Sequence, residues 1–81
     1  MTRRDVIAAL HEAVALVLPH VGAEEIRMDR NLEQLGADSV DRIEILVGMT
    51  QRLGVQRPLS SFATVPDIGA LIDMLVSEAG R

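Results

Sequence analysis

The sequence contains no cysteine, tryptophan, tyrosine or lysine, and its only aromatic residue is Phe62. Without cysteine, disulfides and thiolate metal sites are excluded. No apolar run approaches the roughly 18 residues that a membrane-spanning helix needs. The first residues, MTRRDVIAAL, lack the apolar core and small-residue cleavage site of a signal peptide. We therefore expect a cytoplasmic protein that makes no contact with a membrane.

The composition favours one small helical domain that spans residues 1–81. Of the 81 residues, 48% are hydrophobic, which is too many for a disordered chain. The core must come from aliphatic residues and alanine, and such cores suit helical bundles better than β-sandwiches. The net charge is −4, and all eight basic residues are arginines that form no stripe. Nucleic-acid binding is therefore not expected.

Hydrophobic periodicity predicts two long helices in the first two thirds of the chain. Apolar residues recur at three- and four-residue intervals over 3–18, and Pro19 stops that helix. Thr2 and Asp5 have the spacing of a capping box at its start. The second helix covers 39–53 and ends before a glycine, which commonly follows the last turn of a helix.

The last third of the chain predicts one short and one longer helix. Between two prolines there is room only for a short turn over 59–63. Thr64 and Asp67 then have capping-box spacing, with Pro66 expected in the first turn of the final helix. Gly80 is expected to close the chain.

A long connection over 19–38 separates the first two helices. Loops longer than about 12–15 residues are uncommon in compact domains and usually carry function or local order. Ile26, Leu32 and Leu35 are the expected anchors into the core, and 31–35 is a candidate for a short turn. The predicted fold class is all-α: a small bundle of three main helices plus one short helix, with a long first loop and no metal site. We expect a monomer.

The second helix is apolar on two sides. Its core face is formed by Ile45, Leu46, Met49 and Leu53. The nearly opposite side carries Val40, Ile43 and Val47, with Glu44 among them and Asp41 beside them. A chain this short has too few other elements to cover both sides of one helix. We therefore interpret the second face as a docking surface for partner proteins, in preference to full burial.

Ser39 opens this helix, and its role has three interpretations: a structural residue, an enzymatic nucleophile or a substrate. As a structural residue, Ser39 is either the N-cap itself, or Asp38 is the cap and the Ser39 hydroxyl projects from the first turn. Enzymatic nucleophilicity is not supported, because His11 and His20 have no obvious orienting carboxylate and GADSV is not a nucleophile elbow. A third role is that of a substrate, modified by another enzyme. A helix N-terminus suits an incoming phosphate.

The stretch LGADSVDRIEI resembles the phosphopantetheine attachment motif of acyl carrier proteins, Gly-x-Asp-Ser-Leu. Here the motif is Gly36-Ala37-Asp38-Ser39-Val40. The resemblance extends over nearly the whole chain, because the order and lengths of the predicted helices also match. It implies an all-α acyl-carrier fold and a carrier rather than an enzyme.

The resemblance also implies a cofactor and a set of partners. Ser39 would attack coenzyme A on a phosphopantetheinyl transferase and so become the phosphoprotein residue that holds a covalent 4′-phosphopantetheine arm. Asp38, and Gly36 in the motif, belong to the same cofactor site, with Asp38 helping to hold the metal of the transferase. The arm would carry acyl groups as thioesters. The matching positions for partner docking are Val40, Asp41, Arg42, Ile43, Glu44 and Val47.

Three segments resemble the free-standing donor carriers of polyketide β-branching cassettes. They are Ser-Val-Asp-Arg from Ser39, Pro-Leu-x-x-Phe from Pro58 and Asp-Ile-Gly-x-Leu from Asp67. In that subfamily an acyltransferase loads malonyl and a decarboxylating ketosynthase-like enzyme converts it to acetyl. The carrier then donates the acetyl group to an enzyme similar to hydroxymethylglutaryl-CoA (HMG-CoA) synthase.

Two alternatives remain open on the sequence. The chain is either a general carrier of type II polyketide or fatty-acid synthesis, or an unmodified helical interaction module in which Ser39 is only a cap. Arg42 has two interpretations as well: a residue that a specific partner recognises, or a solvated arginine. Arg42, Arg52 and Arg57 depart from the acid-rich second helix of fatty-acid carriers, so we expect more of the docking to depend on apolar contacts.

Overall fold

The computed structural model describes residues 2–79, which form helices and loops without a β-strand. In chain order the elements are α1 (Arg3–Val17), η1 (Ala23–Glu25), η2 (Glu33–Leu35), α2 (Ser39–Leu53), η3 (Leu59–Phe62) and α3 (Ile68–Ala79), where η marks a 3-10 helix. The predicted all-α class is confirmed, with three main helices and a long first loop. The expected closing residue, Gly80, lies outside the described residues. Among the helices described, none is long and apolar enough to cross a membrane.

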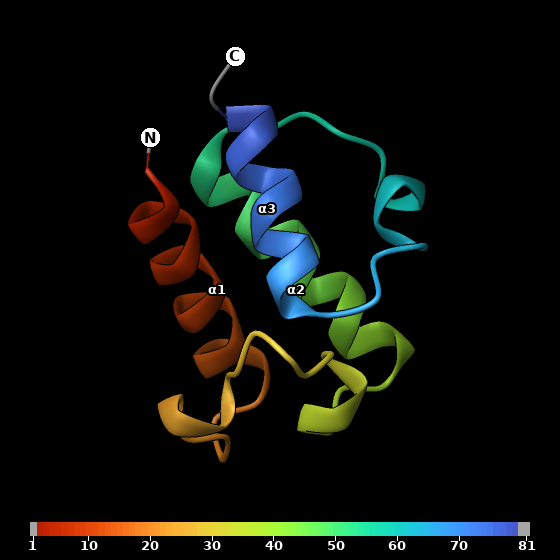
Figure 1. Ribbon diagram of the computed structural model, residues 1–81. Helices are drawn as coiled ribbons and strands as arrows, with labels where there is room; N and C mark the ends of the chain where they lie inside the picture. The colour runs from red at the N-terminus through yellow and green to blue at the C-terminus, as the bar shows by residue number, and fades with distance from the viewer. Residues whose placement is uncertain (1, 80–81) are drawn as a thin grey trace.

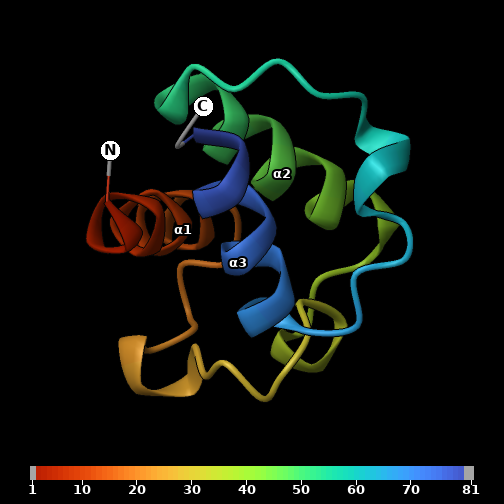
Figure 2. The same ribbon diagram turned by 45° about the horizontal axis from the view of Figure 1, so that its top comes forward.

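The three α-helices share one aliphatic core. α1 packs against both α2 and α3, while η3 packs against α2 on the side away from α1 (Figures 1 and 2). The largest side chains that are fully buried are Val6, Leu10, Val14, Ile45, Met49, Ile68, Ile72 and Leu75. Each main helix contributes to this set at three- and four-residue spacing, as the hydrophobic periodicity predicts. Phe62 adds the only aromatic side chain to the core from η3.

The start of α1 is the predicted capping box. The Thr2 hydroxyl accepts a hydrogen bond from the Asp5 amide at 3.3 Å, and the Thr2 amide donates to the Asp5 carboxylate at 2.8 Å. The hydrogen bond from the Thr2 backbone lowers the pKa of Asp5, because it favours the charged carboxylate. At the other end, α1 stops at Val17, one residue earlier than predicted, with Leu18 as its C-cap before Pro19.

The long first loop is ordered by burial. Ile26, Leu32 and Leu35 are buried, which confirms all three predicted anchors. The predicted turn is η2, and it is closed at its start by reciprocal bonds between the amides and side chains of Asn31 and Gln34, at 2.8 and 2.9 Å. A second turn, η1, was not predicted, because it buries no residue and leaves no apolar pattern in the sequence.

Backbone hydrogen bonds join the first loop to the beginning of α3. The Ile68 amide donates to the Arg30 carbonyl at 2.7 Å, and the Gly69 amide donates to the Met28 carbonyl at 2.9 Å. Amides in the first turn of a helix lack partners within the helix, so these two carbonyls satisfy donors that would otherwise need water or a cap. The loop and α3 are therefore held together although they are far apart in the sequence.

These bonds also explain why the predicted start of α3 is wrong. The helix begins at Ile68, and the Asp67 carboxylate accepts a hydrogen bond from the Ala70 amide at 2.8 Å. Asp67 therefore takes the cap position that the sequence assigned to Thr64, and Pro66 precedes the helix instead of lying in its first turn. The short helix η3 similarly ends at Phe62, one residue before the predicted end.

Gly54 ends α2, as predicted, in a left-handed conformation with φ of 66°. The amides of Gly54 and Val55 bond to the Gln51 and Thr50 carbonyls, which is the pattern of a Schellman motif. An added Cβ at Gly54 would meet nothing within 4 Å, so the conformation alone requires glycine here. Gly54→Ala should lower the free energy of unfolding by about 1 kcal/mol in urea denaturation.

Gly48→Ala is the matched control, because it makes the same chemical change inside α2. Its Cβ would lie 3.5 Å from the Ala13 Cβ and 3.0 Å from the end of the flexible Arg52 side chain. We expect this variant to raise the free energy of unfolding by up to about 1 kcal/mol through helix propensity. Equal destabilisation by the two substitutions would contradict the conformational explanation.

Candidate functional site

The residues before Ser39 form a rigid turn between η2 and α2. Gly36 has φ of 101°, which is left-handed and favours glycine. Its amide bonds to the Glu33 carbonyl at 2.9 Å, and the Ala37 amide bonds to the Leu32 carbonyl at 3.2 Å, which is again a Schellman pattern. The Ala37 side chain is buried. The motif glycine and alanine therefore fix the direction in which the chain enters α2.

Asp38, and not Ser39, is the N-cap of α2. The Asp38 carboxylate accepts a hydrogen bond from the Asp41 amide at 2.8 Å, and the Asp38 amide donates to the Asp41 carboxylate at 3.3 Å. This reciprocal pair decides between the two structural interpretations of the serine. Ser39 occupies the first helical position, its hydroxyl takes no part in the cap, and the residue is exposed.

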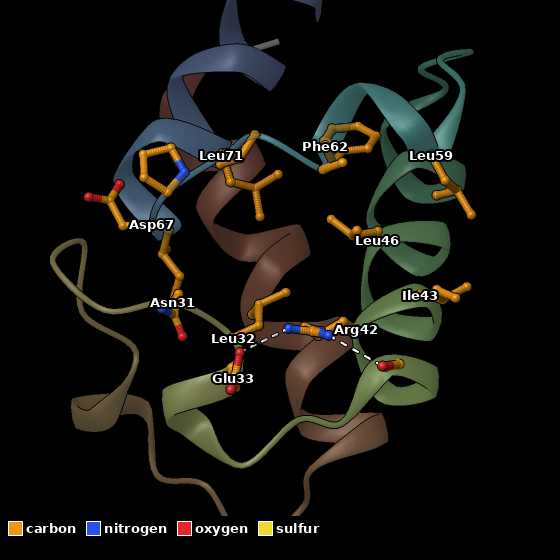
Figure 3. A pocket seen from close by; sticks show the side chains of 15 residues that line it. Asn31, Leu32, Glu33, Arg42, Ile43, Leu46, Leu59, Phe62, Asp67 and Leu71 are labelled. Carbon is orange, nitrogen blue, oxygen red and sulfur yellow. Dashed lines mark hydrogen bonds and ion pairs between the residues drawn. The ribbon is translucent and has the colours of Figure 1, made fainter.

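The side chain of Arg42 lies between Ser39 and Glu33. Its Nη2 is 3.4 Å from the Ser39 hydroxyl oxygen, and its Nη1 is 3.2 Å from a Glu33 carboxylate oxygen (Figure 3). The guanidinium can donate hydrogen bonds but cannot accept the serine proton. Ser39 is therefore positioned beside a cation and has no activating base in this contact.

A cavity of about 520 Å³ opens beside these residues, between α2, η3 and the start of α3. Apolar side chains such as Leu46, Phe62 and Leu71 line it, together with polar ones at the start of α2 and in the first loop (Figure 3). The polar set is Asn31, Glu33, Ser39, Arg42 and Asp67. The serine therefore lies at the edge of an apolar hollow that the sequence did not predict.

On the second face of α2, half of the six predicted docking residues are exposed. Val40 is 61% and Ile43 is 49% exposed, and Glu44 is also exposed, so full burial of this helix is excluded. Asp41, Arg42 and Val47 are half-buried. Leu46, assigned to the core face, is only half-buried because its side chain borders the cavity.

Sequence reasoning missed Glu33 as a member of the site. No motif in the sequence marks Glu33, whereas the structure pairs it with Arg42 although its side chain is 75% exposed. The two residues are nine positions apart and meet only because the Gly36 turn folds η2 against α2. A count of charges along the helix could not reveal this pair. The spacing of an acid and a base across a helix-terminating glycine is the only available signal.

A family model described as the phosphopantetheine attachment site matches residues 8–75. The chain belongs to the acyl carrier protein family. The polyketide biosynthesis acyl-carrier-protein AcpK of Bacillus subtilis is 31% identical over 75 residues, which cover 93% of this chain and 92% of AcpK. No solved structure matches.

Other relatives include proteins longer than this carrier. The chloroplastic acyl carrier protein 2 of Arabidopsis thaliana is 36% identical over 62 residues, covering 73% of this chain and 46% of that protein. The non-reducing polyketide synthase adrD of Penicillium roqueforti is 34% identical over 59 residues, covering 73% of this chain but only 2% of the synthase.

The cofactor of this carrier is covalent 4′-phosphopantetheine, the group for which the matched family is described. The residues at the start of α2 fit such a group. The Ser39 hydroxyl is accessible, it is not needed for the cap, and a guanidinium lies beside it. Members of this family carry acyl groups as thioesters and interact with phosphopantetheinyl transferases, which attach the arm, and with acyltransferases and synthases. The family assignment favours this role over an unmodified interaction module.

The assignment of the cap to Asp38 can be tested without any modification. In the apo protein, Asp38→Ala should lower the free energy of unfolding by about 1 kcal/mol, because the first turn of α2 loses its side-chain acceptor. Ser39→Ala, the neighbouring control, should change it by less than about 0.5 kcal/mol, because its hydroxyl accepts only the long bond from Arg42. Urea denaturation measures both values, and a larger loss for Ser39→Ala would reverse the assignment.

Proposed function

We propose that Ser39 is the attachment residue for phosphopantetheine. The observation that carries this proposal is the division of roles at the start of α2. Asp38 supplies the capping oxygen, which leaves the Ser39 hydroxyl exposed at the first helical position. Gly36 fixes the turn before it. Asp38, the residue that precedes Ser39, would help to hold the metal of the transferase.

The loading step is a phosphoryl-type transfer from coenzyme A, catalysed by a phosphopantetheinyl transferase. The Ser39 oxygen forms a bond to the phosphorus next to pantetheine, and the bond from that phosphorus to the bridging oxygen of the pyrophosphate breaks. Adenosine 3′,5′-bisphosphate leaves, and a base of the transferase takes the serine proton. The attached group supplies a thiol that holds acyl chains as thioesters, which is chemistry that a chain without cysteine lacks.

We further propose that the carrier donates acetyl groups in polyketide β-branching. The three segments that resemble donor carriers meet around one cavity: Ser39 and Arg42, Leu59 and Phe62, and Asp67, Ile68 and Leu71 all line it. Similarity to AcpK over almost its full length supports a role in polyketide biosynthesis. An acyltransferase would load malonyl, a decarboxylating ketosynthase-like enzyme would produce acetyl, and an HMG-CoA synthase-like enzyme would accept it.

The surface that these enzymes would grip is the exposed face of α2. Val40 and Ile43 offer the apolar contact, with Asp41, Arg42, Glu44 and Val47 around them. Exposed apolar residues next to charged ones are typical of protein interfaces in which charge sets the orientation. Because Val40 directly follows Ser39, a partner that docks here meets the root of the arm.

Attachment at Ser39 predicts one mass increment. Incubation with coenzyme A and a broad-specificity transferase should increase the intact mass by one phosphopantetheine in the wild type. Ser39→Ala should abolish the increment, whereas Ser60→Ala, which removes another exposed serine, should leave it unchanged. Circular dichroism checks that both variants keep their helices. An increment that persists in Ser39→Ala would exclude this residue.

Acetyl donation predicts a loss of transfer when the docking face is changed. With acetyl-loaded protein and an HMG-CoA synthase-like enzyme, Val40→Asp and Arg42→Glu should each lower kcat/KM for transfer by about tenfold or more, because each removes or reverses one interface contact. Arg4→Glu is the control, because it reverses the charge of an exposed residue on α1, and it should leave transfer unchanged. Equal transfer by all variants would contradict docking through α2. No transfer even from the wild type would instead favour a general type II carrier.

A further inference from the structure

Arg42 is held between two oxygen partners of unequal quality. Its contact with Glu33 joins two charges, but the Glu33 side chain is 75% exposed, so water screens that pair. The Arg42 side chain is 39% exposed and reaches the Ser39 oxygen at 3.4 Å, a length at the weak end for a hydrogen bond. The unmodified protein therefore occupies the guanidinium with one screened carboxylate and one weak acceptor.

Modification of Ser39 changes the chemistry at this position. A phosphodiester on the serine oxygen carries one negative charge, spread over two oxygens that are two bonds beyond the atom Arg42 already reaches. A guanidinium presents its N–H donors in a fixed planar fork that matches two such oxygens. The first turn of α2 already contains Asp38 and Asp41, so the added charge lies near two carboxylates and gains from a neighbouring cation.

Building on the attachment at Ser39, we propose that Arg42 binds the phosphodiester of the loaded carrier and exchanges Glu33 for it. Arg42 is then a positioning residue that fixes the root of the arm at the edge of the cavity. Glu33 loses its partner, and the side-chain link between η2 and α2 is replaced by a link within α2. The exchange needs no backbone movement, because Arg42 and Ser39 are three residues apart on one helix and are already in contact.

Nuclear magnetic resonance of the arginine side chains tests the exchange in the wild-type protein. The Nε–Hε signal of Arg42 should shift between the apo form and the form loaded with phosphopantetheine. Arg52 is the matched control, because it lies on the same helix as Arg42 but far from Ser39. It pairs with Glu12 of α1 at 3.2 Å, and its signal should not shift. An Arg42 signal that moves no more than that of Arg52 would overturn the proposal.

Thermal unfolding of apo and loaded forms gives an independent readout. Arg42→Met should lower the Tm of the loaded form by about 2–6 °C more than that of the apo form, and this difference should shrink near 1 M salt. Glu33→Gln should lower the Tm of the apo form and leave the Tm of the loaded form unchanged. Arg52→Met should lower the Tm of both forms equally. Equal losses in both forms for Arg42→Met would contradict the exchange.

Intact mass, measured first, separates this proposal from the one on which it rests. If the wild type gains no phosphopantetheine at Ser39, the attachment proposal fails. If the wild type gains the group, but the Arg42 signal does not shift and Arg42 does not raise the Tm of the loaded form, only the exchange proposal fails.

Discussion

The reciprocal hydrogen bonds between Asp38 and Asp41 are the constraint on which the candidate site depends. Were Ser39 the cap, its oxygen would face the amides of the first turn and would be occupied by them. Because a carboxylate takes that position one residue earlier, the helix starts with its donors satisfied and its first side chain projects outward. The Schellman turn at Gly36 and the buried Ala37 then hold the cap itself in place. Asp38 therefore stabilises the start of the helix, and the adjacent Ser39 keeps its hydroxyl free of the cap.

The packing of the bundle explains why a hollow lies next to that serine. α1 packs against both α2 and α3, whereas the element that packs most against α2 on the side away from α1, within residues 2–79, is the short η3 with Phe62. Short aliphatic side chains such as Leu46 and Leu71 leave room there, and backbone bonds from Met28 and Arg30 fix where α3 begins. The cavity therefore lies on the side of α2 where a short 3-10 helix, and not a long α-helix, packs against it.

Local patterns predicted the parts of this structure that depend on neighbours in the sequence. The bounds of α2 and the box at Thr2 follow from periodicity and cap spacing. The anchors Ile26, Leu32 and Leu35 follow from being apolar residues in a loop of mixed charge. The start of α3 was mispredicted because Asp67 can itself cap a helix, and carbonyls from a distant loop fix the helix start just after it. The motif also pointed to Ser39. The contact of Arg42 with Glu33, and the cavity that they border, depend on folding across a turn, which the spacing of the two residues suggests but does not establish.

The arginines that distinguish α2 and its following loop do not act as a free basic patch. Arg42, Arg52 and Arg57 each pair with an acid of the same chain, namely Glu33, Glu12 and Glu78. Their charges are therefore partly neutralised before a partner arrives, so more of the contact depends on the apolar Val40 and Ile43. If Arg42 turns to the phosphodiester on loading, Glu33 becomes an unpaired carboxylate at the same edge. The apo and loaded carriers then present different charges beside an unchanged apolar surface. A partner enzyme that contacts this edge would distinguish them by electrostatic complementarity, before the end of the arm reaches its active site.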